Sequence, residues 1–286
     1  MDYNLCDYNT VKKILSAHGF NFSKALGQNF IIDDSVCPTM AEMLEADEKT
    51  GVLEVGPGVG VLTKELCKRA GKVVSVELDE RLYPVLEQTL ADYDNFELVK
   101  GDVMKIDLKQ LIAEKFADCK TVKVCANLPY YITSPVIMML LQSRLPVSEI
   151  EVMVQQEAAE RLCAPIGSRE AGAVSVAVNY YGESEILFNV GRKCFMPSPK
   201  VDSSVIKIIV RDEPEFEVKN EKQFFSLVKS AFAQRRKTLV NSLSNSLGKS
   251  KADVTNALAQ LGLASTVRAE NLKMEDLVNL TDLLFS

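Results

Sequence analysis

Apolar and polar residues follow two different patterns along the chain, and the change falls near residue 210. Before it, short apolar runs alternate with turns and helical spacing, which indicates strands alternating with helices. From Arg211 onward, apolar residues recur at steps of three or four, which is typical of helices alone. We therefore predict an α/β domain over residues 1–210 and a small all-helical domain over residues 211–286. The predicted strands are residues 51–55, 72–76, 96–100, 121–125, 149–155, 174–181, 185–190 and 204–210.

The same spacing predicts the helices and their ends. Ser134 is expected to cap a helix that runs to Leu141, and Asp33 or Asp34 to cap an earlier one. Residues 23–33, before that cap, read either as a loop or as a lid over a bound ligand. The other predicted helices are one within residues 1–22, then 61–70, 224–247 ended by Gly248, 251–261 and 274–284.

A glycine-rich turn lies between the strand at residues 51–55 and the next predicted helix. Its residues, Gly56-Pro57-Gly58-Val59-Gly60, let the backbone come close to a ligand. The dinucleotide pattern G-x-G-x-x-G is not met, because Val61 or Thr63 stands where the last glycine would be. With Glu54 in front, the pattern is E-x-G-x-G-x-G, which resembles that of S-adenosylmethionine-dependent methyltransferases.

Polar residues stand at the ends of three further strands, at the sheet edge where open α/β folds bind ligands. Glu77 ends the second strand, and its carboxylate can accept both hydroxyls of a ribose. Asp102 follows the third strand and can accept from an adenine amino group, or it can cap a turn. The fourth strand leads into Asn127-Leu128-Pro129-Tyr130. An Asn oxygen and a backbone carbonyl can accept from an amino group, and a Tyr ring can stack on a base; a plain turn is the alternative.

Composition narrows the class of protein. Of 286 residues, 47% are apolar and 25% charged, as in a soluble globular protein, and no apolar run is long enough to span a bilayer. The N-terminus lacks the features of a signal peptide, so a cytoplasmic location is expected. The seven cysteines are scattered without a C-x-x-C pair and read as free thiols. With His18 as the only histidine, a His-based metal site or a Ser-His-Asp triad is excluded.

The charge is uneven along the chain. A net charge of −6 argues mildly against binding to nucleic acid. Acidic residues gather between Glu42 and Glu97, however, whereas Arg235, Arg236 and Lys237 form a basic cluster. A basic face is therefore compatible with the net charge.

Taken together, motifs from about Lys24 to the end resemble those of the ribosomal RNA adenine N6-dimethyltransferase family. Each motif alone is weak, but their order is specific. Within the family, the tail motifs favour the enzymes that act on 16S RNA of the small ribosomal subunit. The motifs are Leu26-Gly-Gln-Asn-Phe-Ile31, Glu54-Val-Gly-Pro-Gly-Val-Gly60, Glu77, Gly101-Asp102, Asn127-Leu-Pro-Tyr130, Phe195-Met-Pro-Ser-Pro199, Phe232-Ala-Gln-Arg-Arg-Lys-Thr-Leu239 and Arg268-Ala-Glu270.

The resemblance implies a Rossmann-like class I methyltransferase sheet that binds S-adenosylmethionine as methyl donor, without a metal. It implies two adjacent N6,N6-dimethyladenosines in 16S RNA as product, the immature small subunit as partner, a role in its maturation, a monomer and no membrane partner. The residues implied for the donor are Asn29, Ile31, Gly56, Glu77, Asp102 and Asn127, and those for the acceptor base are Asn127, Leu128, Tyr130 and Phe195.

Chemistry at the Asn127 motif agrees with those roles. The adenine N6 lone pair is delocalised into the ring, so two acceptors that bind both amino hydrogens would favour a pyramidal, nucleophilic nitrogen. The Asn127 side-chain oxygen and the Leu128 carbonyl can do this. Tyr130 and Phe195 would stack on the two faces of the base, at roughly 1–3 kcal/mol each. Tyr131 is expected to pack within the protein rather than bind.

Other readings remain open at this point. Arg235, Arg236 and Lys237, interpreted as a helical segment, are candidates for RNA contact or simply a solvated face. A large-subunit 23S RNA methyltransferase of the antibiotic-resistance type shares the core motifs. A ribosome assembly factor without catalysis could keep the fold. A DNA amino-methyltransferase would usually show Pro where Leu128 stands, and a target-recognition domain.

Overall fold

The computed structural model describes residues 3–20 and 28–285, and these form two compact units. The first, here the sheet unit, contains the residues up to Ala159 together with Glu185–Val210. The second, here the helical unit, contains Glu160–Ser184 and the residues from Arg211 onward. The predicted domain boundary after residue 210 coincides with the last crossing between the units. The sequence did not indicate that residues 160–184 group with the C-terminal helices.

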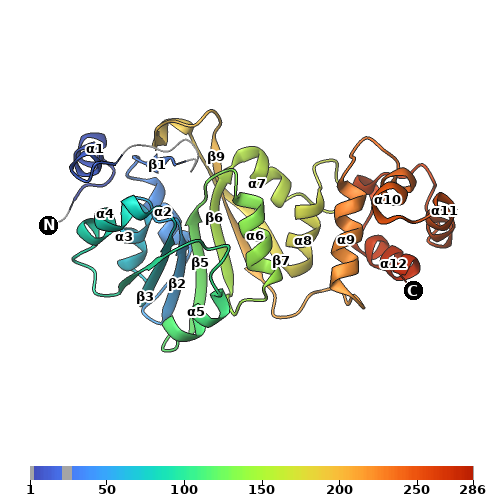
Figure 1. Ribbon diagram of the computed structural model, residues 1–286, viewed down its shortest axis with the longest axis horizontal. Helices are drawn as coiled ribbons and strands as arrows, with labels where there is room; N and C mark the ends of the chain where they lie inside the picture. The colour runs from blue at the N-terminus through green and yellow to red at the C-terminus, as the bar shows by residue number, and fades with distance from the viewer. Residues whose placement is uncertain (1–2, 21–27, 286) are drawn as a thin grey trace. The chain divides into compact units, whose positions relative to one another are not determined.

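Helices and strands alternate through the sheet unit (Figure 1). Within the described residues, no helix is long and apolar enough to cross a lipid bilayer. The strands are β1 (Phe30–Ile31), β2 (Thr50–Val55), β3 (Lys72–Glu77), β4 (Phe96–Lys100), β5 (Thr121–Asn127), β6 (Glu149–Gln155), β7 (Gly182–Val190), β8 (Phe195–Met196) and β9 (Ser203–Val210). The helices are α1 (Tyr8–Ala17), α2 (Val36–Met43), α3 (Val61–Cys67), α4 (Tyr83–Thr89), α5 (Leu108–Lys115), α6 (Thr133–Gln142), α7 (Gln156–Leu162), α8 (Ala173–Tyr181), α9 (Glu221–Phe232), α10 (Leu239–Leu247), α11 (Lys251–Gln260) and α12 (Met274–Phe285).

Seven strands form one twisted sheet in the order β4-β3-β2-β5-β6-β9-β7, and β1 pairs separately with β8. Strands β4 to β6 are mutually parallel, and β9 runs antiparallel to β6. The strand order reverses at β2. Strands β3 and β4 lie on one side of β2, and the chain then crosses over to place β5 on the other side. Because parallel strands end at one edge, this reversal leaves a crevice at the carboxyl ends of β2, β3 and β5. The predicted α/β class is thereby confirmed.

The core of the sheet unit joins buried residues of the strands to those of the helices that cover them. Val52 of β2 and Val73 of β3 lie in a core cluster together with buried residues of α1, α2, α3 and α4. Cys125 of β5 and Met153 of β6 extend the same cluster along the sheet. All six residues of β2 are buried, as expected for a central parallel strand covered on both faces.

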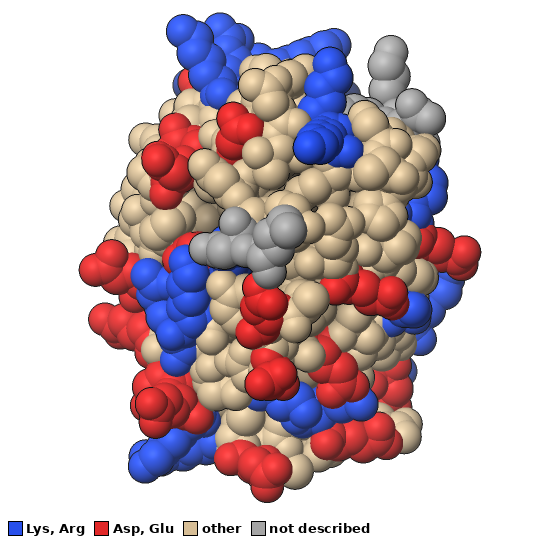
Figure 2. Space-filling model, turned by 90° about the vertical axis from the view of Figure 1, so that its left-hand side faces the viewer, with Lys and Arg blue, Asp and Glu red and all other residues tan. Residues whose placement is uncertain are grey.

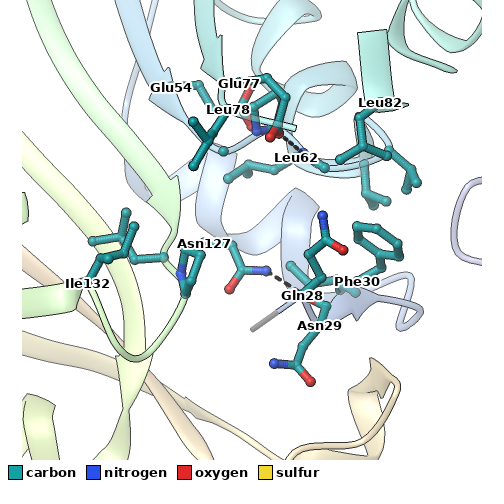
Figure 3. A pocket seen from close by; sticks show the side chains of 18 of the residues that line it. Gln28, Asn29, Phe30, Glu54, Leu62, Glu77, Leu78, Leu82, Asn127 and Ile132 are labelled. Atoms are coloured by element: carbon teal, nitrogen blue, oxygen red, sulfur yellow. Dashed lines mark hydrogen bonds between the residues drawn. The ribbon is translucent and has the colours of Figure 1, made fainter. Parts of the chain in front are cut away.

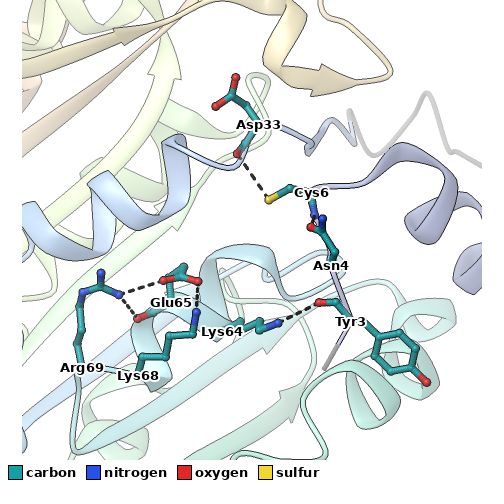
Figure 4. A network of polar contacts seen from close by, with 8 residues as sticks. All are labelled: Tyr3, Asn4, Cys6, Asp33, Lys64, Glu65, Lys68 and Arg69. Atoms are coloured by element: carbon teal, nitrogen blue, oxygen red, sulfur yellow. Dashed lines mark hydrogen bonds and ion pairs between the residues drawn. The ribbon is translucent and has the colours of Figure 1, made fainter. Parts of the chain in front are cut away.

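The N-terminal segment is fastened to α3 and to the residues after β1 (Figure 4). Lys64 of α3 donates from Nζ to the Tyr3 carbonyl at 2.9 Å. The Cys6 thiol donates to the Asp33 carbonyl at 3.6 Å. Val11, Ile14 and Leu15 of α1 are buried. The described residues before β1 are therefore packed against the rest of the sheet unit.

One predicted strand is wrong, because residues 173–181 form helix α8. Its valines favour a strand by propensity, yet packing inside the helical unit decides its structure. Tyr181 stacks on Phe225 of α9 with ring centroids 5.6 Å apart, and Tyr180 lies 5.4 Å from Phe224. At the start of the helix, the Ser175 hydroxyl accepts from the Gly172 N–H at 2.9 Å. That hydrogen bond caps the first turn.

Several predicted helices also differ in their bounds, and the helix predicted over residues 61–70 ends at Cys67. The helix predicted over residues 224–247 is two helices, α9 and α10, because Thr238 is extended and the Leu239 N–H donates to the Val267 carbonyl. Helix α6 begins at Thr133 with Ile132 as its N-cap, not with Ser134. Ser35 is the N-cap of α2, while the Asp33 carboxylate accepts from the Ser35 N–H. Of the segment 23–33, which was read as a loop or a lid, residues 23–27 lie outside the described residues.

A buried ionic cluster lies between the sheet and the end of α2. Glu149 forms ion pairs with Lys123 at 3.0 Å and Lys207 at 3.3 Å. Both lysines also donate to carbonyls of the last turn of α2, those of Leu44 and Met43. Glu151, two residues further along β6, is buried with neither carboxylate oxygen bonded to a described residue. Burial, and the nearby Glu149, raise its pKa to about 8.

Replacing this carboxyl should change how stability depends on pH. A folded pKa of about 8 against 4.5 means that the native state holds a proton more tightly than the unfolded state. The contribution of protonated Glu151 to the free energy of unfolding is therefore full at low pH and is lost as pH rises from about 4.5 to about 8. Glu151→Gln should become progressively more stable than the wild type over that window, as measured by urea unfolding. Glu48→Gln, at an exposed position, is the control, and parallel curves for wild type and Glu151→Gln would contradict the assignment.

Candidate functional site

A pocket opens at the carboxyl ends of β2, β3 and β5, where the strand order reverses (Figure 3). Glu77, Leu78 and Leu82 lie together on one side of it, and Asn127 and Asn29 lie across from them. Residues 28–31, which include β1, supply a third side. The residues that line the pocket are Gln28, Asn29, Phe30, Ile31, Glu54, Gly56, Pro57, Gly58, Val59, Val61, Leu62, Glu77, Leu78, Leu82, Asn127, Leu128, Pro129, Tyr130, Tyr131 and Ile132.

The glycine-rich turn forms one wall because its backbone can adopt conformations closed to most residues. Gly56 and Gly58 have φ of 71° and 62°, in the left-handed region. A Cβ on Gly58 would also lie 3.1 Å from the Phe30 ring. The Gly58 N–H instead points to Glu77, whose Oε2 accepts from it at 3.4 Å. The turn and the acid at the end of β3 thus form one unit.

Glu77 is a buried carboxylate held by main-chain donors. Its Oε1 accepts from the Asp79 N–H at 2.8 Å, in addition to the bond from Gly58. Burial nevertheless raises its pKa to about 7, and the Asp79 carboxylate contributes in the same direction. Leu78, the next residue, is 49% exposed and lines the pocket beside it. An acid next to an exposed apolar side chain suits a sugar joined to a flat base.

Glu54 serves a different purpose at the end of β2. Its Oε2 accepts from the Thr63 hydroxyl at 2.7 Å and from the Ser75 hydroxyl at 2.5 Å. These bonds tie helix α3 and strand β3 to β2 directly below the glycine-rich turn. Burial raises the pKa of Glu54 to about 7, so this carboxyl is partly protonated near neutral pH. Glu54 therefore supports the pocket wall from inside the core.

Asn127 is the last residue of β5, two residues beyond the predicted end of that strand. Its Nδ2 donates to the Asn29 carbonyl at 3.3 Å, which fixes the orientation of the amide (Figure 3). The side-chain oxygen is left as an acceptor, as the proposed chemistry requires. Tyr130 is held by a 2.8 Å hydrogen bond between its hydroxyl and that of Ser203. Tyr131 was expected to pack, but it is 55% exposed and lines the pocket, so that expectation is wrong.

Most of the residues predicted for the donor and the acceptor base converge here, and two of them do not line the pocket. Asp102 forms an ion pair with Lys105 at 3.3 Å and accepts from the Met104 N–H at 3.0 Å within its own turn. Phe195 is 3% exposed and pairs with Ile31 across the β1–β8 ladder. Their predicted roles stay predictions. The predicted residues that line the pocket are Asn29, Ile31, Gly56, Glu77, Asn127, Leu128 and Tyr130.

Sequence reasoning missed a polar chain behind the pocket wall. Gln28, which lines the pocket, donates from Nε2 to Asp79 Oδ2 at 2.7 Å. Asp79 is buried and also forms a 2.6 Å ion pair with Arg81. The Arg81 guanidinium lies 4.8 Å from the centroid of the Phe20 ring, and Phe20 packs against Phe30. Glu77-x-Asp79-x-Arg81 is an alternating strand-end pattern that could have drawn attention to this chain.

Comparison with known proteins gives a consistent result. The family model described as "Ribosomal RNA adenine dimethylase" matches residues 19–285. "Ribosomal RNA small subunit methyltransferase A" of Bacillus pumilus is 46% identical over 96% of this chain and 94% of its own. The protein of the same name from Anoxybacillus flavithermus is 43% identical over the same shares.

Solved structures show the same fold. The 23S rRNA methyltransferase ErmE superposes with a TM-score of 0.66 at 26% identity, over 90% of this chain and all of that one. A dimethyladenosine transferase from Plasmodium falciparum gives a TM-score of 0.69 at 24% identity, over 87% of this chain and 95% of its own. The fold is that of class I methyltransferases, with a mostly parallel sheet.

Proposed function

The chain belongs to the ribosomal RNA adenine dimethylase family, and on that premise we propose the reaction of its pocket. It transfers methyl groups from S-adenosylmethionine to the N6 amino group of adenosines in 16S ribosomal RNA. The products are N6,N6-dimethyladenosines at two adjacent positions. It acts as a monomer in the cytoplasm, on the immature small subunit, as part of the maturation of that subunit.

One observation supports this proposal above the others. An acid and a glycine-rich turn lie in the same pocket as Asn127-Leu128-Pro129-Tyr130. The acid and the glycine-rich turn suit the ribose and amino-acid parts of a nucleoside donor. The Asn127-Leu128-Pro129-Tyr130 motif suits the amino edge of a base. A pocket that combines the two can align a donor with an acceptor amine, and alignment accounts for much of the rate of such a transfer.

The donor end fits S-adenosylmethionine. The Glu77 carboxylate can accept both ribose hydroxyls, and Leu78 offers an apolar surface to the adenine. The left-handed glycines leave room for close approach of the donor to the backbone at Gly56. When bound, the donor supplies a methyl group already activated by its sulfonium. Asn29 and Ile31 close the site from the β1 side, and Asp102 remains a proposed partner of the adenine amino group.

At the acceptor end, the protein orients an amine rather than removing a proton with a strong base. The Asn127 amide is turned by its bond to Asn29 so that its oxygen can accept one N6 hydrogen. The Leu128 carbonyl would accept the other. The lone pair of a pyramidal N6 then points at the methyl group. Tyr130 would stack on the base, and Phe195, which is buried in the β1–β8 ladder, remains the proposed partner for the other face.

Two alternatives differ in substrate or in catalysis. Likeness to a 23S rRNA methyltransferase favours a large-subunit substrate, but that protein is only 26% identical. The relatives named for the small subunit are 43–46% identical over nearly the whole chain, which favours 16S RNA. An assembly factor without catalysis would have no need for the Asn127 geometry.

We also propose Arg235, Arg236 and Lys237 as RNA contacts, on the turn between α9 and α10.

A substrate comparison tests the proposed function. Labelled S-adenosylmethionine offered with under-methylated small subunits, large-subunit RNA and duplex DNA should label only adenosines of the small subunit. Asn127→Ala should reduce transfer by at least about a hundredfold, since it removes an acceptor aligned with N6. Asn189→Ala, at a residue that bonds Ser204 outside the pocket, is the matched control. Label in large-subunit RNA would overturn the substrate, and near-normal transfer by Asn127→Ala would overturn the role of Asn127.

Donor affinity should depend on pH through Glu77. Because its pKa is raised to about 7, the carboxylate that accepts the ribose hydroxyls forms fully only above that pH. Affinity measured by calorimetry should therefore rise between about pH 6 and pH 8 and then level off. Glu77→Gln should bind more weakly, on the order of tenfold, with a flat profile. A slope that survives in Glu77→Gln and disappears in Glu54→Gln would assign the titration to Glu54 instead.

Asp79 should act as a positioning residue for the donor site. Asp79→Asn keeps the side-chain size but weakens the bonds to Gln28 and Arg81, so the pocket wall loses its support. We expect the dissociation constant of S-adenosylmethionine to rise on the order of tenfold. Asp47→Asn removes a carboxylate bonded to Thr50 at the other end of the sheet and serves as control. Equal donor affinity in both variants, at equal thermal stability, would show that Asp79 has no such role.

A further inference from the structure

Three exposed cations lie on the connection between β7 and β9, and we name them the basic rim: Arg192, Lys193 and Lys200. None of them forms an ion pair with a carboxylate of the described residues. Many other lysines and arginines of the sheet unit do, for example Lys72 with Glu97. The three side-chain charges of the basic rim are therefore not neutralised by direct ion pairs, and they outnumber the two carboxylates bonded to this connection, Asp33 and Asp202.

The connection is ordered by its own hydrogen bonds. The Arg192 N–H donates to Asp202 Oδ1 at 2.8 Å, and the Ser198 hydroxyl donates to the Arg192 carbonyl at 2.7 Å. The Arg192 guanidinium donates one N–H to the Lys200 carbonyl at 3.2 Å, which leaves its other donors available. These bonds hold the two ends of the connection together. The backbone that carries the three cations is therefore held in a compact arrangement.

The same connection is joined to the pocket. Strand β8 pairs with β1, with Ile31 opposite Phe195, and the Ile32 N–H donates to the Cys194 carbonyl at 2.8 Å. Phe30 and Ile31 of β1 line the pocket. At the other end of the connection, Ser203 bonds the hydroxyl of Tyr130. The basic rim is thus attached to both the donor wall and the acceptor motif.

Charge on the sheet unit is distributed unevenly. Figure 2 shows Lys and Arg gathered along the upper edge of one face, while Asp and Glu are more numerous over its middle and lower part. The whole chain carries a net charge of −6, so a polyanion is repelled by most of the surface. Binding to RNA then requires a local group of cations whose side chains are not held in ion pairs. The basic rim, on a connection joined to the pocket walls, meets this condition among the described residues.

We infer that the basic rim binds the phosphates that flank the target adenosine as its base enters the pocket. This inference rests on the proposed function and identifies where the sheet unit contacts RNA. A base placed against Asn127 and Tyr130 brings its own backbone to the pocket mouth, and the connection that carries the three cations is joined to the pocket walls through β1 and Tyr130. Arg192 can bind a phosphate with two parallel N–H donors, and the two lysines add point charges. Phosphate contacts of this kind position the strand without reading its sequence.

The basic rim differs from the cluster at Arg235, Arg236 and Lys237. That cluster lies in the helical unit, where Arg235 also donates to the Arg169 carbonyl. The basic rim lies in the same compact unit as the pocket. It should therefore affect how the target strand is placed as well as how tightly RNA is held.

The test compares RNA binding as a function of salt. The rim variant is Arg192→Gln/Lys193→Gln/Lys200→Gln, and the milder Lys193→Gln/Lys200→Gln keeps the Arg192 bond to the loop. The matched control is Lys49→Gln/Lys109→Gln/Lys120→Gln, three exposed lysines of the sheet unit remote from the pocket lining. A third variant neutralises Arg235, Arg236 and Lys237. Each is titrated with under-methylated small subunits at several salt concentrations, and donor binding and thermal unfolding are measured alongside.

For the rim variant we expect the slope of log affinity against log salt to fall by about two and affinity near 0.1 M salt to fall at least about tenfold. The milder variant, which removes two of the three charges, should show about two-thirds of that change in slope, with donor affinity unchanged in both. A slope like that of the wild type in both rim variants, or an equal loss in the control, would overturn the inference. Wild-type enzyme that binds small subunits but transfers no label would refute the proposed function separately.

Discussion

The pairing of two short strands, β1 with β8, is the constraint on which the arrangement of the pocket depends. Two residues from each side form the ladder, with Phe30 opposite Met196 and Ile31 opposite Phe195. One strand belongs to the wall of the donor site, and the other lies within the connection that carries the basic rim. Segments separated by more than 160 residues are thereby held at a fixed distance from each other. Because so few hydrogen bonds form the ladder, burial of Phe30, Ile31, Phe195 and Met196 has to stabilise it.

Two buried carboxyls at neighbouring strand ends show how similar groups acquire different roles. Glu54 accepts from two hydroxyls inside the core and stabilises the junction of β2, β3 and α3. Glu77 accepts from two main-chain N–H groups at the pocket surface. Burial raises the pKa of each to about 7. Glu54 is satisfied by the protein, whereas Glu77 lines the opening and gains further partners only when a ligand with hydroxyl groups binds.

Much of this arrangement could be predicted from local sequence. Strand ends marked by Gly56, Glu77 and Asn127 were correctly placed at one edge of the sheet, because apolar runs and the residues that end them are local signals. The strand expected at residues 174–181 and the single helix at 224–247 were wrong, because aromatic packing and a bond from Leu239 to Val267 decided them. The exposure of Tyr131 and the Gln28–Asp79 contact could not be foreseen, since both depend on which distant segments meet.

The net negative charge and a polyanionic substrate are compatible once the position of each cation is considered. At many places on the sheet unit, cations are neutralised locally, as in the pairs Lys115–Glu97 and Arg81–Asp79. None of the three cations of the basic rim forms such a pair, and they outnumber the adjacent carboxylates of Asp33 and Asp202, so a phosphate there meets net positive charge. Acidic residues elsewhere then repel the RNA from surfaces that cannot deliver a base to the pocket. Net charge therefore limits where RNA can bind productively, and the few unpaired cations next to the pocket determine where it does.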